Sequence, residues 1–476
     1  MVDRLAATGL GSRAMVNIWG WERHVEAMLD VERALILALG SLGILKEETA
    51  TAAAAMCTID RIDPVGLAEE AAAAATPVIP LVARIRAEMD VSLADAVHVG
   101  ATSQDIIDTA TALQLRAGLQ HIEEQLLAVG DVCAALAERH RDDVMVGRTL
   151  GQHAVPITFG LKAARWSAAI GRRIVALRRV RAEQNIVQFG GAAGTLGSFG
   201  AAGLAVAEQV ALRLDMGLPS LPRHSERDHV ADLASALGVI AGVSGRIASD
   251  LVMLAQSEVS EVSFGGDAVT SSAMPQKRNP VDAVAARAAA RLAMSEALGI
   301  MGSVAEHEFE RSAGAWQAES VALPSLLVRT AGSLERLLSA LVALVPDTDR
   351  MRRNLEAAHG LTASEALVRA LSPVLGSTAA AEVVTELSRE VVLSDRVLQD
   401  VALSESRVVD AIGESGIASA LDPTASLRSV AEMIDRALEE YRSLRALADE
   451  ATLPSRSRAG RDIEPGLRPE HAKAVP

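Results

Sequence analysis

Aromatic residues and cysteines are scarce in this sequence of 476 residues. Aromatics make up 2% of the chain, although hydrophobic residues make up 50%. Sheets favour Val, Tyr and Phe, whereas the Ala, Leu, Glu and Arg that abound here favour helix. Only Cys57 and Cys133 occur, which excludes a disulfide framework and a Cys-rich metal site. The composition predicts a nearly all-α protein suited to a reducing cytosol.

The sequence also lacks an excess of positive charge, a signal peptide and a membrane span. The 46 Lys and Arg against 61 Asp and Glu leave a formal charge of -15, so no global field attracts nucleic acid or an anionic membrane. Met1–Arg4 opens no apolar segment of signal-peptide length. The Ala-rich stretch 71–83 is broken by Pro77 and Pro80. We expect a cytoplasmic protein without nucleic-acid or membrane partners, in which any anionic substrate must be bound by local cations.

Hydrophobic periodicity divides the chain into three helical domains and a tail. The expected parts are an N-terminal domain (1–98), a central long-helix bundle (99–346), a C-terminal domain (347–452) and a disordered tail (453–476). Apolar residues recur at helical spacing from Trp166 to Val180 and from Leu233 to Leu254, the latter within a helix of roughly 45 Å. Their apolar surface is wider than one stripe, which predicts contacts between subunits.

Four polar islands interrupt these helices. They are His98–Asp105, Gly147–Gly160, Gln188–Gly197 and Thr270–Pro280. Thr102 or Ser103 in the first island is expected to cap the helix that follows. The free N–H groups and dipole at such a helix start also favour a carboxylate ligand, so the capping and binding roles are compatible.

The other islands are weaker signals when each is taken alone. Glycine-rich stretches such as the third also serve tight helix packing. A lone His153 is more often a structural hydrogen-bonding residue than a catalyst. The fourth island combines two hydroxyls, two cations and an amide, a mixture that core packing does not require, although Ser, Pro and Asn are ordinary loop residues.

Together and in this order, the four islands resemble the fumarase/aspartase superfamily over about Ser12 to Glu440. Within it the chain is most similar to the bacterial 3-carboxy-cis,cis-muconate cycloisomerases, at Thr76–Val82, His224–Asp228 and Gly314–Glu319. Ser12–Trp19 instead resembles the start of adenylosuccinate lyases. The resemblance implies an all-α, three-domain fold and a homotetramer in which each site combines residues from three subunits.

The resemblance also implies roles for individual residues. The first serine of the signature loop, here Ser271, is the family's usual proton abstractor beside a carboxylate. Its alkoxide requires stabilisation by loop N–H groups and Lys277. The expected catalytic residues are Ser271, Lys277 and His153, and the expected substrate-binding residues are Thr102, Ser103, Gln152, Thr195, Asn279 and Arg311.

One departure from the family pattern limits which leaving groups the reaction can have. Fumarases and adenylosuccinate lyases carry a proton-donating histidine after the Arg-Thr pair of the second island, where this chain has Leu150. Val284 stands where many adenylosuccinate lyases have the glutamate that orients this histidine. General acid catalysis matters least when the leaving group is a weak base, such as a lactone carboxylate or nitrite. This condition is compatible with the reaction that the resemblance implies, the lactonisation of carboxymuconate to carboxy-muconolactone, a step of protocatechuate breakdown.

Three alternatives stay open. One is elimination of nitrite from nitrosuccinate to give fumarate, which Leu150 suits equally, and another is adenylosuccinate lyase activity, disfavoured by the missing acid pair. The third is a helical scaffold that lost its chemistry, because fold alone does not establish function. Retention of Ser271, Lys277 and Asn279 argues against it. The histidines lack metal-ligand spacing, so neither a metal nor another cofactor is predicted.

Overall fold

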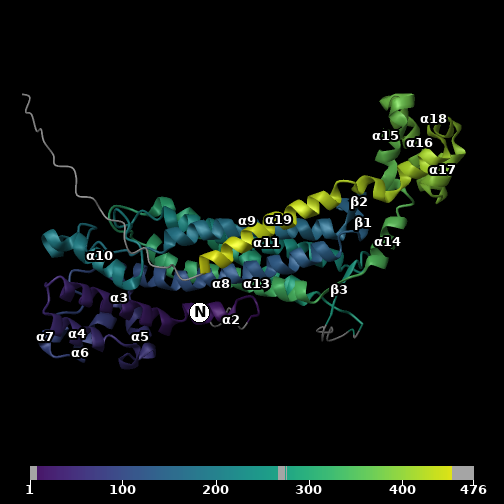
Figure 1. The fold of residues 1–476 in the computed structure, drawn as a ribbon. Coiled ribbons are helices and arrows are strands. Elements are labelled where there is room, and N and C mark those ends of the chain that lie inside the picture. Colours follow the sequence, from purple (N-terminus) through teal and green to yellow (C-terminus); the bar gives the residue numbers. More distant parts are fainter. Residues whose placement is uncertain (1–7, 266–273, 275, 453–476) are drawn as a thin grey trace, which may run out of the picture.

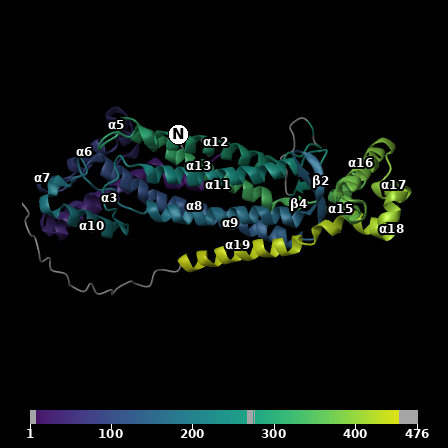
Figure 2. The same ribbon diagram turned by 90° about the horizontal axis from the view of Figure 1, so that it is seen from above.

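The computed structural model describes residues 8–265, 274 and 276–452, and it confirms the predicted all-α architecture. Ser271 and the tail 453–476 lie outside the described residues. Long helices run side by side as a bundle, with N-terminal helices against one end and a group of short helices beyond the other (Figure 1; Figure 2).

Five long helices and one returning helix build the bundle. They are α8 (Ser103–Arg139), α9 (Phe159–Gln184), α11 (Asp228–Leu254), α12 (Val281–Ser303), α13 (Ala315–Val342) and α19 (Val430–Thr452). At 1.5 Å per residue, the 37 residues of α8 span roughly 55 Å. The bundle is therefore long enough to keep its two ends apart.

Most of the remaining helices gather at the two ends of the bundle, whereas α2 (Arg13–Trp19) lies alongside α8 and α13. Near the end where α8 begins lie α3 (Trp21–Ser41), α4 (Glu47–Met56), η1 (Ile59–Arg61), α5 (Pro64–Ala74), α6 (Val78–Ala87), α7 (Val91–Ala94), η2 (Gly197–Ala202), α10 (Gly203–Leu214) and η3 (Val304–Glu306). At and beyond the opposite end lie α14 (Thr348–Glu356), η4 (Leu361–Ala363), α15 (Ser364–Leu375), α16 (Ser377–Ser394), α17 (Leu398–Ser404), α18 (Ser406–Leu421) and η5 (Pro423–Leu427).

The C-terminal helix α19 leaves that group and runs back along the bundle (Figure 1). Its Ile434, Leu438 and Tyr441 are buried in the main hydrophobic core. The Tyr441 hydroxyl donates to the backbone oxygen of Leu127, 2.9 Å away on α8. The last part of the segment 347–452 thus packs with the bundle helices.

The periodic stripes are the buried faces of α9 and α11, as predicted. In α11, Leu233, Leu237 and Leu251 are fully buried. This helix is long and apolar enough to cross a membrane by length and composition, but its apolar face packs inside the bundle core. Small residues bring α11 and α12 close together: a Cβ added at Gly238 would lie 2.9 Å from the Cβ of Ala297.

Two short antiparallel pairs of strands break the all-helical pattern at one end. β1 (Val144–Thr149) pairs with β2 (Gln152–Thr158), and β3 (Val262–Phe264) pairs with β4 (Leu344–Pro346). The β1–β2 turn consists of Leu150 and Gly151, with φ of 52° and 79°. Both central residues of a type I′ turn have positive φ, which suits glycine and disfavours leucine.

Candidate active site

A buried carboxylate organises the start of α8. Asp105 is fully buried and accepts hydrogen bonds from the backbone N–H groups of Thr102, Gly190 and Gly191, at 3.0, 2.9 and 2.9 Å. His224 Nε2 lies 2.8 Å from the same carboxylate. These four contacts hold the first polar island, the third polar island and the segment before α11 in fixed positions relative to one another.

A second buried carboxylate follows one helical turn later. Asp108 accepts from Arg227 Nη1 at 2.7 Å and from Trp316 Nε1 at 2.8 Å. Arg227 also donates to Glu319, at 3.2 Å from Nε and 2.5 Å from Nη2. Burial opposes the charge of this guanidinium, but the two carboxylates raise the pKa of Arg227 above its ordinary value. Arg227 therefore links α8 to α13 through two buried ion pairs.

His229, two residues after Arg227, is held in its neutral form. Burial, followed by the charges of Arg227 and Arg223, lowers the pKa of His229 to about 4. Its Nδ1 is buried without a hydrogen-bond partner among the described residues.

Four of the predicted substrate-binding residues lie at this end of the bundle. Thr102 is the N-cap residue of α8 and Ser103 its first residue, as predicted. Arg311 donates to Gln104 Oε1 at 2.7 Å and to the backbone oxygen of Ala192 at 2.8 Å. Arg311 thus ties the third island to α8. Thr195, the fourth, is exposed on the third island.

The remaining described candidates lie at the opposite end. Gln152 and His153 begin β2 and are exposed. Leu150, at the tip of this hairpin, has a relative exposure of 101%. The structure therefore presents an apolar side chain at the hairpin tip, where no proton donor is available from residue 150.

Lys277 and Asn279 precede α12 at this same end. Gly238 and Gly245 of α11 face Ala297 and Ala290 of α12, so the helices are antiparallel and α12 starts beside the end of α11. Lys277 is exposed and Asn279 half-buried. Ser271, the predicted base, lies outside the described residues.

An ion pair fixes the second island to the segment before β3. Arg148 donates to both carboxylate oxygens of the buried Glu261, at 2.8 and 2.7 Å. Asn354 donates to Glu261 as well, at 2.9 Å. The hairpin and the strand that leads toward Lys277 are thereby held together.

One chain does not bring all of the predicted residues together. Thr102, Ser103, Thr195 and Arg311 are separated from Gln152, His153, Lys277 and Asn279 by the length of the bundle (Figure 1). A site that uses both sets requires the end of one bundle to meet the opposite end of another. The subunit sharing that the family resemblance implies stays a prediction.

The sequence interpretation assigned no role to the buried charges around α8. Asp105 and Asp108 are three residues apart, as are His224 and Arg227. The structure pairs Asp105 with His224 and Asp108 with Arg227. Two acids and two basic residues, each pair three residues apart, were the available signal. Among the described residues, no group of three or more His, Cys, Asp and Glu side chains is arranged to hold a metal ion.

Comparison with known proteins identifies the class of this helical protein as a lyase. A family model described as "Lyase" matches residues 45–294. The 3-carboxy-cis,cis-muconate cycloisomerase of Bradyrhizobium diazoefficiens is 38% identical over 91% of this chain and 97% of its own length. The nitrosuccinate lyase of Streptomyces davaonensis is 37% identical over 90% of this chain and 92% of its own length.

Solved structures give the same result. The crystal structure of β-carboxy-cis,cis-muconate cycloisomerase from Acinetobacter calcoaceticus superposes with a TM-score of 0.85. It is 34% identical, and the match covers 92% of this chain and 100% of that one. The chain belongs to the fumarase/aspartase superfamily of lyases.

Proposed function

We propose that this lyase adds or eliminates a group beside a carboxylate-stabilised carbanion of a polycarboxylate, and that its substrate is 3-carboxy-cis,cis-muconate, which it converts to carboxy-muconolactone. Leu150 carries the proposal. Its exposed side chain at the hairpin tip supplies no proton, so the chemistry must suit a leaving group that departs as a weak base. A lactone carboxylate meets this condition. The similarity to muconate cycloisomerases supports the same substrate.

The start of α8 is the proposed carboxylate site. Thr102 and Ser103 offer hydroxyls beside the free N–H groups of a helix of 37 residues. Thr195 and Arg311 lie at the same end, and Gln152, Lys277 and Asn279 complete the proposed binding set from the other end of a bundle. Cations and N–H donors aimed at the reacting carboxylate stabilise the enediolate-like dianion that forms.

Ser271 is the proposed proton carrier. In the lactonising direction a substrate carboxylate adds to the double bond and Ser271 delivers a proton to the resulting carbanion. Lys277 stabilises the alkoxide that remains, and His153 donates a hydrogen bond to the substrate.

A homotetramer with shared sites is the proposed assembly. Two observations support it: the two halves of the binding set lie at opposite ends of each chain, and α12 exposes apolar residues along its length. Val281, Val284, Leu292, Leu298 and Met301 are 38–68% exposed on this helix. Large exposed apolar side chains such as these are common in subunit interfaces.

Release of nitrite from nitrosuccinate is the second candidate. Nitrite is also a weak base, so Leu150 suits this elimination equally. The 37% identity to a nitrosuccinate lyase supports it.

A substrate panel tests the proposal. The purified protein is assayed with carboxymuconate, nitrosuccinate, adenylosuccinate, argininosuccinate, and fumarate with ammonia, by ultraviolet absorbance and nitrite detection. Turnover of carboxymuconate alone is the expected result. Nitrite release selects the second candidate, turnover of adenylosuccinate contradicts the argument from Leu150, and turnover of none revives the scaffold alternative.

A further inference from the structure

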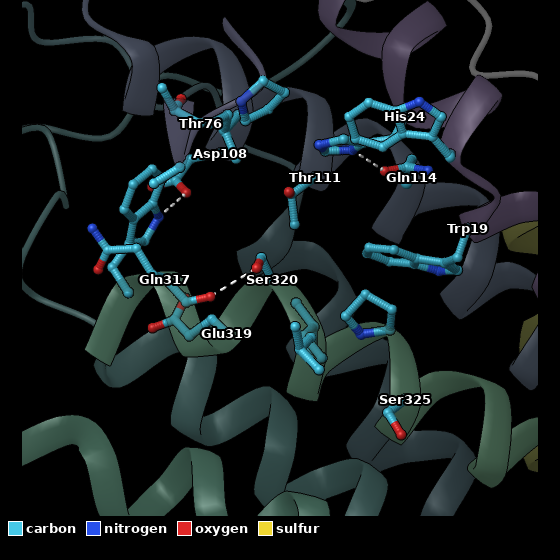
Figure 3. Close-up of a pocket in the computed structure, with 18 of the residues that line it drawn as sticks. Trp19, His24, Thr76, Asp108, Thr111, Gln114, Gln317, Glu319, Ser320 and Ser325 are labelled. Atoms are coloured by element: carbon cyan, nitrogen blue, oxygen red, sulfur yellow. Dashed lines mark hydrogen bonds between the residues drawn. The ribbon is translucent and has the colours of Figure 1, made fainter. Parts of the chain in front are cut away.

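A cavity of about 360 Å³ lies between the N-terminal helices, α8 and α13 (Figure 3). Three of the chain's four tryptophans, Trp19, Trp21 and Trp316, line it. Its volume is in the range that encloses a small organic molecule. Flat indole walls favour a planar ring, which stacks on them or meets them edge to face.

The one guanidinium in the cavity wall is already paired with two carboxylates. Arg227 is the one guanidinium among the lining residues, and its donors are used by Asp108 and Glu319. A carboxylate entering the cavity would meet these two acids and no uncommitted cation of the lining. Desolvating an unpaired charge is costly, so the cavity selects against anionic groups.

His24 gives the cavity a hydrogen-bond acceptor. Gln114 Nε2 donates to the backbone oxygen of Ile18 at 2.9 Å, which turns its Oε1 toward His24 Nδ1, 2.8 Å away. Figure 3 shows this contact between His24 and Gln114. Because the amide oxygen accepts, His24 Nδ1 carries the hydrogen. Burial lowers the pKa of His24, so the ring is neutral near pH 7. Its Nε2 is left with a lone pair and makes no hydrogen bond to any described residue.

We infer that this cavity binds an uncharged planar ring that bears an O–H or N–H donor, with the donor directed at His24 Nε2. A phenol is the simplest ligand of this class. The tryptophan walls hold the ring, His24 orients its donor, and the two acids of the wall, with no uncommitted cation beside them, exclude its anionic analogues.

The cavity lies next to the proposed carboxylate site. Ile107, Thr111 and Gln114 line it from α8 at intervals of four and three residues. Ser103 lies on the same helix face one turn earlier, because residues four apart are neighbours on a helix. The inference goes beyond the proposed reaction and does not depend on it, since ligand binding is measured without turnover.

Binding of phenol to the unaltered full-length protein is the first test, followed by tryptophan fluorescence and by calorimetry. Methoxybenzene matches the ring but has no donor, and benzoate matches the ring but carries a charge. We expect saturable binding of one phenol per chain, with both analogues at least about tenfold weaker, the effect of one well-placed hydrogen bond or one unpaired charge. Equal binding of methoxybenzene, tighter binding of benzoate, or absence of saturable phenol binding overturns the inference.

Two variants locate the site. His24→Leu should remove the preference for phenol over methoxybenzene, whereas Trp166→Phe, which alters the tryptophan outside the cavity, should keep both binding and the fluorescence response. A phenol preference that survives in folded His24→Leu contradicts the role of His24. The comparison of ligands on the unaltered protein decides the matter even where a variant does not fold.

Discussion

His224 Nε2 and Asp105 Oδ1 lie 2.8 Å apart, with side-chain exposures of 4% and 0%. The two residues are 119 positions apart in the sequence. Since Asp105 also accepts three backbone N–H groups, its carboxylate holds two loops and one helix start in a fixed relation.

Replacing this carboxylate by an amide should destabilise the protein strongly. In Asp105→Asn one acceptor oxygen becomes an NH₂ group that faces buried donors, and we expect a loss of about 3 kcal/mol in the free energy of unfolding. Urea denaturation followed by circular dichroism measures it. The exposed Asp349→Asn is the matched control and should change the midpoint little. Equal effects of the two substitutions would contradict the assignment.

Removing the Arg227 guanidinium, which links α8 to α13, should leave the buried carboxylates of Asp108 and Glu319 without the positive charge that neutralises them. For Arg227→Leu we expect a loss of about 3–5 kcal/mol, the usual result of breaking a buried ion pair from one side. Arg436→Leu, at an exposed i,i+4 pair, serves as the control. Adding Glu319→Gln to Arg227→Leu should recover part of the loss, because it neutralises one unpaired acid. A double variant less stable than the single one would refute this account.

The stability of the protein should fall with acidification in part because of His229. Its pKa is about 4 in the folded state against an ordinary value of 6.5. On acidification, this histidine is protonated in the unfolded state at a higher pH than in the folded state. His229 therefore costs no stability above pH 6.5, and the free energy of unfolding decreases as the pH falls from 6.5 toward 4. The full effect is about 3 kcal/mol. His229→Asn should flatten the dependence between these limits in denaturation curves taken across the pH range. Parallel curves for the two proteins would show that His229 does not contribute.

Hybrid oligomers should recover activity lost in each parent. Thr102→Val/Ser103→Ala disables the α8 end, and Lys277→Ala disables the opposite end. If one site draws on the two ends from different chains, random mixing by joint refolding restores intact sites at about a quarter of the total. The measurement is turnover of the active panel substrate per milligram before and after mixing. Mixed oligomers that stay inactive would contradict shared sites.

Ser271→Ala should lower kcat by about 10²–10⁴, the usual contribution of a positioned proton carrier. Ser260→Ala is a suitable control, because this exposed hydroxyl donates to the backbone oxygen of Ser257. Circular dichroism should confirm that both variants are folded. Near-normal turnover in a folded Ser271→Ala protein would show that another residue moves the proton.

The sequence predicted the long helices and the cap of α8 because both depend on local pattern. The spacing of Leu233, Leu237 and Leu251 requires one buried face, and Thr102 stands where an N-cap is expected. It did not predict the return of α19 along the bundle. That packing depends on contacts such as Tyr441 to Leu127, 314 residues apart, for which no local signal exists.

The candidate site was predicted by residue type but not by position in space. Arg311 was expected to bind substrate, and the structure shows in addition that it fastens the third island to Gln104. His24 gave no signal in the sequence, because its tautomer depends on Gln114 and Ile18, which helical periodicity does not place beside it.

The position of Asp105 also affects how the chain folds during synthesis. Its donors on Gly190 and His224 are 85 and 119 residues further along the chain. The start of α8 therefore leaves the ribosome long before the groups that satisfy its buried carboxylate. Until the segment up to His224 has been translated, the carboxylate of Asp105 remains solvated by water. The N-terminal helices lack a packing partner until that later part of the chain has been made.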